Sequence, residues 1–121
     1  MLAGSGGIRV GNLLSIEGGA GRVPQGIEAE TLVASCLAQF ARGSIAALYD
    51  LGVAFSTASH GVAADLVEAH KWFNIAAARG HEEAAWCRAD VAEEMTAREI
   101  AEAQRRAREW LRSDAAERRA A

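Results

Sequence analysis

Aromatic residues, proline and cysteine are all scarce in this chain of 121 residues. Aromatics make up 6% of it although half is hydrophobic, so alanine supplies much of the apolar content. The single proline, Pro24, leaves the rest free of the strongest helix breaker, and alanine loses no side-chain entropy in a helix. The two cysteines form neither a C-x-x-C pair nor a disulfide framework, which favours reduced, partly buried thiols. The composition therefore predicts an all-α domain.

A strong charge imbalance and a long apolar run are also missing. The net charge of −3 gives no electrostatic reason to expect binding to nucleic acid or to an anionic membrane. No apolar segment approaches the roughly 18 residues that a membrane span requires. The weak apolar segment at the N-terminus has no Lys or Arg before it and is interrupted by glycines, so a signal peptide is not expected. These features predict a soluble, cytoplasmic protein.

Glycine divides the chain into two parts. Eight of the 12 glycines fall in residues 1–26, which predicts either a flexible leader or a degenerate repeat there. Apolar periodicity begins at residue 27 and predicts a helical body that ends near residue 112, with 113–121 frayed. The predicted helices span about 27–42, 44–57, 66–79, 81–95 and 97–112. Asp65 with Glu68 and Thr96 with Glu99 form capping-box patterns at the starts of two of them.

An internal repeat runs through this helical body. Gly43-x-x-x-Ala47 recurs 37 residues later as Gly80-x-x-x-Ala84, and the same offset aligns Tyr49 with Trp86. Residues 68–73 align with 106–111 at an offset of 38, and both contain alanine followed by Trp three positions later. A period in the high thirties with one helix–turn–helix per unit is typical of an α-solenoid. The clearest unit is 47–84, and a degenerate unit follows at 81–112.

The clearest unit carries small residues and aromatics at fixed intervals, which suits two closely packed antiparallel helices. Its structural motif, with the Trp of the next unit, comprises Leu51, Gly52, Phe55, Asp65, Ala69, Trp72, Phe73, Ala77, Gly80, Ala84 and Trp110. Together with Ala47, Gly61 and Val62, this pattern resembles the Sel-one-like repeat, a solenoid relative of the tetratricopeptide repeat. The resemblance implies a right-handed solenoid of stacked helix hairpins and a bacterial, adaptor-like, protein-binding role. Ala58 departs from the family, which usually has glycine there, and His60 is an extra residue in the loop.

Catalytic, cofactor and metal sites are not predicted. His60, His70 and His81 are scattered over a loop, a helix face and a turn, without the spacing of a zinc protease helix. The serines lie outside any G-x-S-x-G elbow, and the glycines near the N-terminus lack the Lys of a phosphate loop. Arginines near the C-terminus are interleaved with carboxylates, which is typical of a solvated helix face. We therefore expect a protein that is not an enzyme and needs no cofactor.

Protein–protein interaction is the predicted function. Stacking of the two units is expected to bring Tyr49 and Trp86 to the same side, in an acidic groove with aromatic anchors. The predicted partner-binding residues are Tyr49, Asp50, Val53, Trp86, Asp90 and Glu94. Such a groove suits a protein partner or a basic or amphipathic peptide. The competing interpretation is that both aromatics simply pack between repeats.

A structural role is the alternative function. A short solenoid exposes apolar end faces, so the chain could instead form a homo-oligomer or cap a larger assembly.

Overall fold

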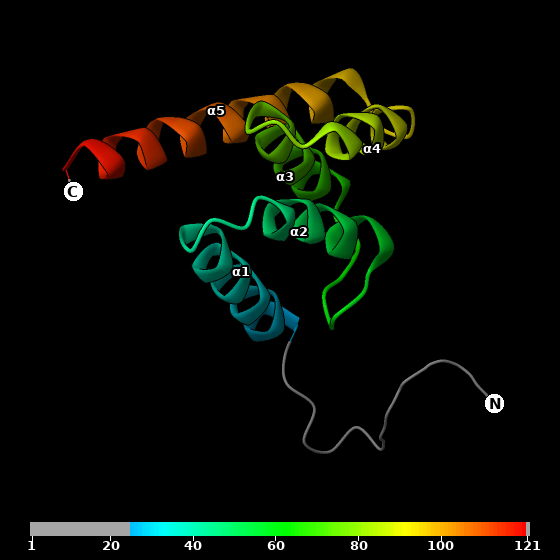
Figure 1. Cartoon of the computed structure of the whole chain (residues 1–121). Coiled ribbons are helices and arrows are strands. Elements are labelled where there is room, and N and C mark those ends of the chain that lie inside the picture. The colour runs from blue at the N-terminus through cyan, green and yellow to red at the C-terminus, as the bar shows by residue number, and fades with distance from the viewer. Residues whose placement is uncertain (1–24, 121) are drawn as a thin grey trace, which may run out of the picture.

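The computed structural model describes residues 25–120, which form five α-helices and contain no strand (Figure 1). The helices are α1 (Gln25–Ala41), α2 (Ala46–Thr57), α3 (Leu66–Ala78), α4 (Glu82–Ala92) and α5 (Ala97–Ala120). The predicted all-α class with about five helices is confirmed. The leader or degenerate repeat predicted for 1–26 falls, up to residue 24, outside the described residues. Within the described part, no helix combines the length and the apolar character that crossing a membrane requires.

Helix α3 is the centre of the fold. It packs against α2 on one side and against α4 and α5 on the other, while α1 packs against the far side of α2 (Figure 1). The largest fully buried side chains come from α2 and α3 and are Leu48, Leu51, Phe73 and Ile75. The core therefore lies between α2 and α3, in the unit that the sequence marks most clearly.

Gly52 is the point of closest approach between α2 and α3. A Cβ atom added to Gly52 would lie 2.5 Å from two atoms of the Phe73 ring, far inside van der Waals contact. Phe73 is 1% exposed, so its ring fills the space that a side chain on Gly52 would need. The predicted role of Gly52, to let two helices approach closely, is confirmed.

The predicted helix starts at Asp65 and Thr96 are both present. Thr96 and Glu99 form a complete capping box, in which the Glu99 N–H donates to Thr96 Oγ1 (3.1 Å) and the Thr96 N–H donates to Glu99 Oε1 (2.8 Å). Asp65 accepts from the Glu68 N–H at 3.1 Å, but the Glu68 carboxylate pairs with Arg106 on α5 instead of returning to Asp65. Glu68, in the first turn of α3, therefore joins α3 to α5 and does not complete the capping box.

The loop between α2 and α3 keeps a left-handed backbone without the expected glycine. Ala58 has φ 56° as the C-cap of α2, and its N–H donates to the Ala54 carbonyl. His60 has φ 60° and Gly61 has φ 79°. Since left-handed backbone is costly for any residue with a Cβ, Ala58 and His60 hold this loop under strain.

Helix α5 is longer than predicted. The expected end near residue 112 and the fraying predicted for 113–121 are wrong for residues 113–120, because α5 continues to Ala120, and residue 121 lies outside the described residues. Asp114 explains the extension, since it accepts hydrogen bonds from Arg79 beyond the end of α3 (2.5 Å) and from Arg118 one turn further along α5 (2.8 Å). These ion pairs fasten the last turns of α5 to the body of the protein.

Residues at the repeat offset lie in contact or are buried alike in several cases. Trp72 and Trp110 are in contact, with ring centroids 5.7 Å apart at an interplanar angle of 75°. Ala69 on α3 and Ala107 on α5 are each 0% exposed. The second unit differs from the first in one respect. Its two helices, α4 and α5, each pack against α3 but do not pack closely against each other.

Candidate partner-binding surfaces

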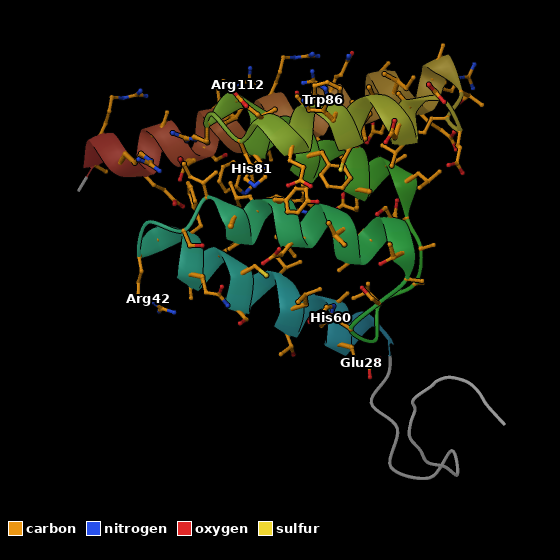
Figure 2. The ribbon with its side chains drawn as sticks, turned by 45° about the vertical axis from the view of Figure 1, so that its right-hand side comes forward. Glu28, Arg42, His60, His81, Trp86 and Arg112 are labelled. Carbon is orange, nitrogen blue, oxygen red and sulfur yellow. The ribbon has the colours of Figure 1, made fainter. Side chains whose placement is uncertain are left out.

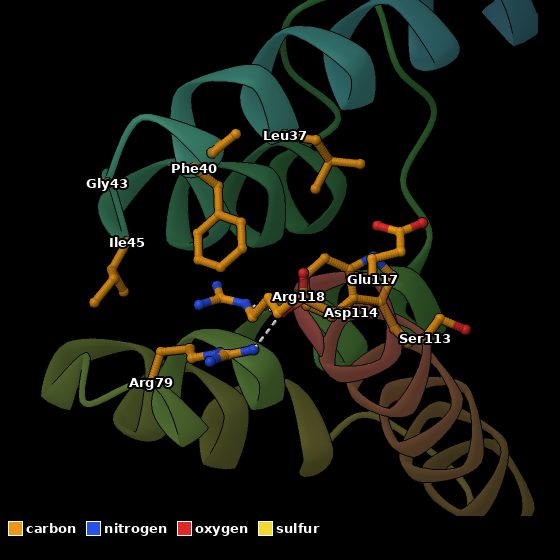
Figure 3. A pocket seen from close by; sticks show the side chains of 11 residues that line it. Leu37, Phe40, Gly43, Ile45, Arg79, Ser113, Asp114, Glu117 and Arg118 are labelled. Carbon is orange, nitrogen blue, oxygen red and sulfur yellow. Dashed lines mark hydrogen bonds and ion pairs between the residues drawn. The ribbon is translucent and has the colours of Figure 1, made fainter. Parts of the chain in front are cut away.

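A cleft of about 780 Å³ opens between the C-terminal end of α1 and the C-terminal half of α5 (Figure 3). Its origin is the difference in helix length. At 1.5 Å per residue, α5 is about 36 Å long and α3 about 20 Å, so α5 extends well past the end of α3. Because α1 packs on α2 and not closely on α3, the space between α1 and the overhanging part of α5 stays open. The volume is within the range of about 300–1,000 Å³ that is usual for ligand-binding pockets.

Apolar side chains line one part of the cleft. Phe40 near the end of α1 and Trp110 on α5 have ring centroids 5.9 Å apart at an angle of 57°. Leu37, one turn before Phe40, and Ile45, just before α2, extend this lining. All four are partly exposed, so their apolar surface is available to a ligand.

Two arginines share one carboxylate at the edge of this apolar lining (Figure 3). Arg79 and Arg118 both donate to Oδ2 of Asp114, and both guanidinium groups lie over the Phe40 ring, at 5.7 and 5.4 Å from its centroid. A guanidinium has five N–H donors, so both groups retain donors that Asp114 does not use. The Nε atom of Arg79 is buried and has no acceptor among the described residues. The cleft therefore offers guanidinium hydrogen-bond donors beside an apolar surface, although Asp114 and Glu117 balance the two arginines in net charge.

Tyr49 lies inside the helical packing and not in a groove. Its ring stacks on His81 at the start of α4 (4.6 Å between centroids, 11° between planes) and contacts Phe73 (5.8 Å). The Cys87 thiol lies 3.9 Å from the Tyr49 hydroxyl. Burial, reinforced by this hydrogen bond, raises the pKa of Tyr49 to about 12. For Tyr49, packing between the units is the interpretation that holds.

Trp86 lies on the outer face of α4 and is 75% exposed (Figure 2). Asp90 and Glu94 are also exposed there, one and two turns further along the chain. Asp50 is exposed on α2, whereas Val53 is half-buried against the core. The structure therefore does not bring the six predicted partner-binding residues together: Tyr49 and Val53 pack inward, and the acidic residues around Trp86 form a separate surface.

The cleft residues were not predicted from the sequence. Trp110 was predicted only as part of the structural motif, and Asp114 and Arg118 fell in the segment predicted to fray. The residues come from α1, the end of α3 and α5, and no spacing in the sequence connects them. One signal in the sequence could have predicted the longer α5: Asp114 is followed four residues later by Arg118, and an ion pair at that spacing favours a helix.

The histidines and cysteines lie in different parts of the fold. His81 caps α4, where its Nδ1 accepts from the Ala84 N–H at 3.1 Å, and His60 is exposed in the α2–α3 loop. His70 is 3% exposed, and its burial, with a smaller contribution from Arg88, lowers its pKa. Burial raises the pKa of the Cys36 thiol. Within residues 25–120, no group of three or more His, Cys, Asp or Glu side chains is arranged to hold a metal ion.

Comparison with known proteins returned no matching family model, no matching curated protein and no matching solved structure.

Proposed function

We propose that the chain is a non-catalytic protein-interaction module that holds a segment of a partner protein in the cleft between α1 and α5. The observation that carries the proposal is the cleft itself, with the partly exposed Phe40 and Trp110 rings beside the guanidinium groups of Arg79 and Arg118. Aromatic and arginine side chains are the residue types most enriched in binding hot spots.

The chemistry of the cleft selects an amphipathic, acidic segment. An apolar side chain of the partner covers Phe40 and Ile45, and a nearby carboxylate accepts the unused donors of Arg79 and Arg118 in a charge-assisted hydrogen bond. This replaces the expectation of a basic peptide held in a groove beside Tyr49, because Tyr49 is packed against His81.

The resemblance to the Sel-one-like repeat supports an adaptor role and remains part of this proposal. The tight contact of Gly52 with Phe73 and the pairing of Trp72 with Trp110 are consistent with stacked units of that family. A right-handed solenoid and a cytoplasmic, bacterial setting belong to the same proposal.

A random peptide library displayed on phage tests the proposal. Peptides selected on the wild-type protein are expected to combine a large apolar residue with Asp or Glu. Arg118→Glu is expected to weaken their binding about tenfold or more, measured by fluorescence anisotropy, since it replaces attraction by repulsion. Arg98→Glu makes the same charge change at the other end of α5, away from the cleft, and is the matched control.

Circular dichroism first verifies that both variants keep the wild-type helix content. Selection that enriches no peptide, or peptides that bind wild type and Arg118→Glu equally, would show that the cleft is not the binding site.

A further inference from the structure

The outer faces of α4 and α5 form a second surface at the opposite end of the molecule from α1 (Figure 1). Both helices pack against α3 with their inner faces, so their outer faces point away from the body of the protein. Trp86 and Arg112 both lie at this end (Figure 2). Trp86 is 75% exposed, and among the described residues it is the one large hydrophobic side chain that is exposed.

The exposure of Trp86 follows from its position in the repeat. Tyr49, its counterpart in the preceding unit, is covered by His81 and Cys87 of α4. No helix of the described chain follows to cover Trp86 in the same way. Trp86 therefore lies where a further helical element would stack, and a molecule docking at this end covers it.

Carboxylates surround Trp86 on α4. Glu82, Trp86, Ala89 and Glu93 follow one another at spacings of four, three and four residues, which places them on one helix face, and all four are exposed. Glu83 and Asp90 are exposed beside this stripe. Arg88, the one basic residue of α4, turns away and donates to Asn74 on α3 at 2.7 Å. We call the exposed set of Glu82, Glu83, Trp86, Ala89, Asp90 and Glu93 the acidic stripe.

Arginines occupy the corresponding face of α5. Arg98, Arg105, Arg112 and Arg119 recur every seven residues and are all exposed, on the side of α5 opposite the buried alanines 103 and 107. Arg108 is exposed next to them. Arg105 pairs with two carboxylates of its own helix, but the other four lie beyond ion-pair distance of any carboxylate in the described chain. We call the five arginines the basic stripe.

We propose that a second copy of this chain docks on the α4–α5 end face, with the acidic stripe of each copy against the basic stripe of the other. An acidic stripe and a basic stripe on two helices that both pack against α3 become self-complementary under a two-fold rotation, which is the symmetry of most homodimers. Each Trp86 is then buried against arginines of the other copy, where a guanidinium stacks on the indole ring. The cleft between α1 and α5 has no part in this contact, so failure of either proposal leaves the other standing.

Sedimentation velocity over a range of about 1–500 μM tests the association. A concentration-dependent shift from monomer to dimer is expected at low salt, and the shift should move to higher concentration in about 0.5 M salt, because salt screens exposed charge pairs. Trp86→Ala is expected to raise the dissociation constant about tenfold or more. A wild-type protein that stays monomeric over the whole range overturns the proposal, as does a dimer that Trp86→Ala leaves unchanged.

A charge exchange identifies the contact. The variant Glu82→Arg/Glu83→Arg/Asp90→Arg/Glu93→Arg makes both stripes basic, and Arg98→Glu/Arg108→Glu/Arg112→Glu/Arg119→Glu makes both acidic, so each variant alone should be monomeric. An equimolar mixture should form a heterodimer, since basic then faces acidic in both halves of the interface. Glu30→Arg on α1 is the control and should dimerise like wild type. Variants that dimerise alone, or fail to associate when mixed although circular dichroism shows them folded, overturn the pairing.

Discussion

Replacement of Gly52 by alanine should destabilise the protein although alanine is the better helix former. The added Cβ would lie 2.5 Å from Phe73 Cδ1 and Cε1, where carbon atoms normally stay about 3.5–4.0 Å apart. The ring is 1% exposed and cannot move aside, so α2 and α3 must separate by roughly 1 Å. A clash this deep against a buried ring belongs to the upper part of the usual range for overpacking, about 2–3 kcal/mol, against a gain of about 1 kcal/mol in helix propensity. The expected net loss is about 1–2 kcal/mol.

A thermal melt followed by circular dichroism measures this loss. For a domain of this size, about 4–8 °C of melting temperature correspond to 1 kcal/mol, so the midpoint should fall by roughly 5–15 °C. Phe73→Ala supplies the control because it removes all three ring atoms that the added Cβ would meet, Cγ, Cδ1 and Cε1. In that background Gly52→Ala should become neutral or stabilising by up to about 1 kcal/mol. A higher melting temperature for Gly52→Ala alone would refute the close approach of the two helices.

Four further predictions follow from the described contacts. Trp72→Ala should lower the free energy of unfolding by about 3–5 kcal/mol, measured in a thermal melt, whereas Trp72→Phe should cost much less, since the indole N–H has no acceptor within residues 25–120. Ala58→Gly should stabilise the protein by about 0.5–1 kcal/mol, because it relieves a left-handed alanine. Burial lowers the pKa of His70 below 6.5 in the folded protein. The free energy of unfolding, measured by urea titration, should therefore be highest above pH 6.5 and should fall as the pH drops towards the folded-state pKa. His70→Leu should remove this slope, whereas His60→Gln, on an exposed loop, should keep it. Asp114→Ala should accelerate amide exchange of α5 beyond residue 113 without affecting α2, measured by mass spectrometry.

The helices and the centre of the fold were predictable from local signals. Gly43 and Gly80 end helices with φ of 103° and 98°, and Thr96 with Glu99 forms the predicted capping box. These features depend on residues within one or two turns of each other, so the residue types that they require can be recognised from the local sequence alone. The Gly52 contact was also predictable, because a glycine in a helical apolar stripe usually marks a close backbone approach.

The end of α5 was not predictable in the same way. The apolar stripe of this helix ends at Leu111, and the segment after residue 112 was therefore predicted to fray. The interaction that keeps them helical is Asp114 with Arg79, which lies 35 residues earlier in the chain. Only the folded arrangement shows that α5 passes over the end of α3 and brings these two residues together.

The predicted groove failed for a related reason. The repeat offset correctly placed Tyr49 and Trp86 at equivalent positions on α2 and α4. Equivalent positions have equivalent surroundings only where both units have a neighbour on the same side. Tyr49 has α4 as that neighbour and is packed, whereas Trp86 is exposed.

Helix α5 contributes to both proposed surfaces through opposite faces. Trp110 and Asp114 face the body of the protein, where they form one wall of the cleft. Arg105, Arg112 and Arg119 point outward from the same helix and form the basic stripe. The ion pair of Asp114 with Arg79 fixes where the last turns of α5 lie, and so determines both the width of the cleft and the position of Arg119. Most of the basic stripe precedes Asp114, so the dimer contact should depend less on this ion pair than peptide binding in the cleft does.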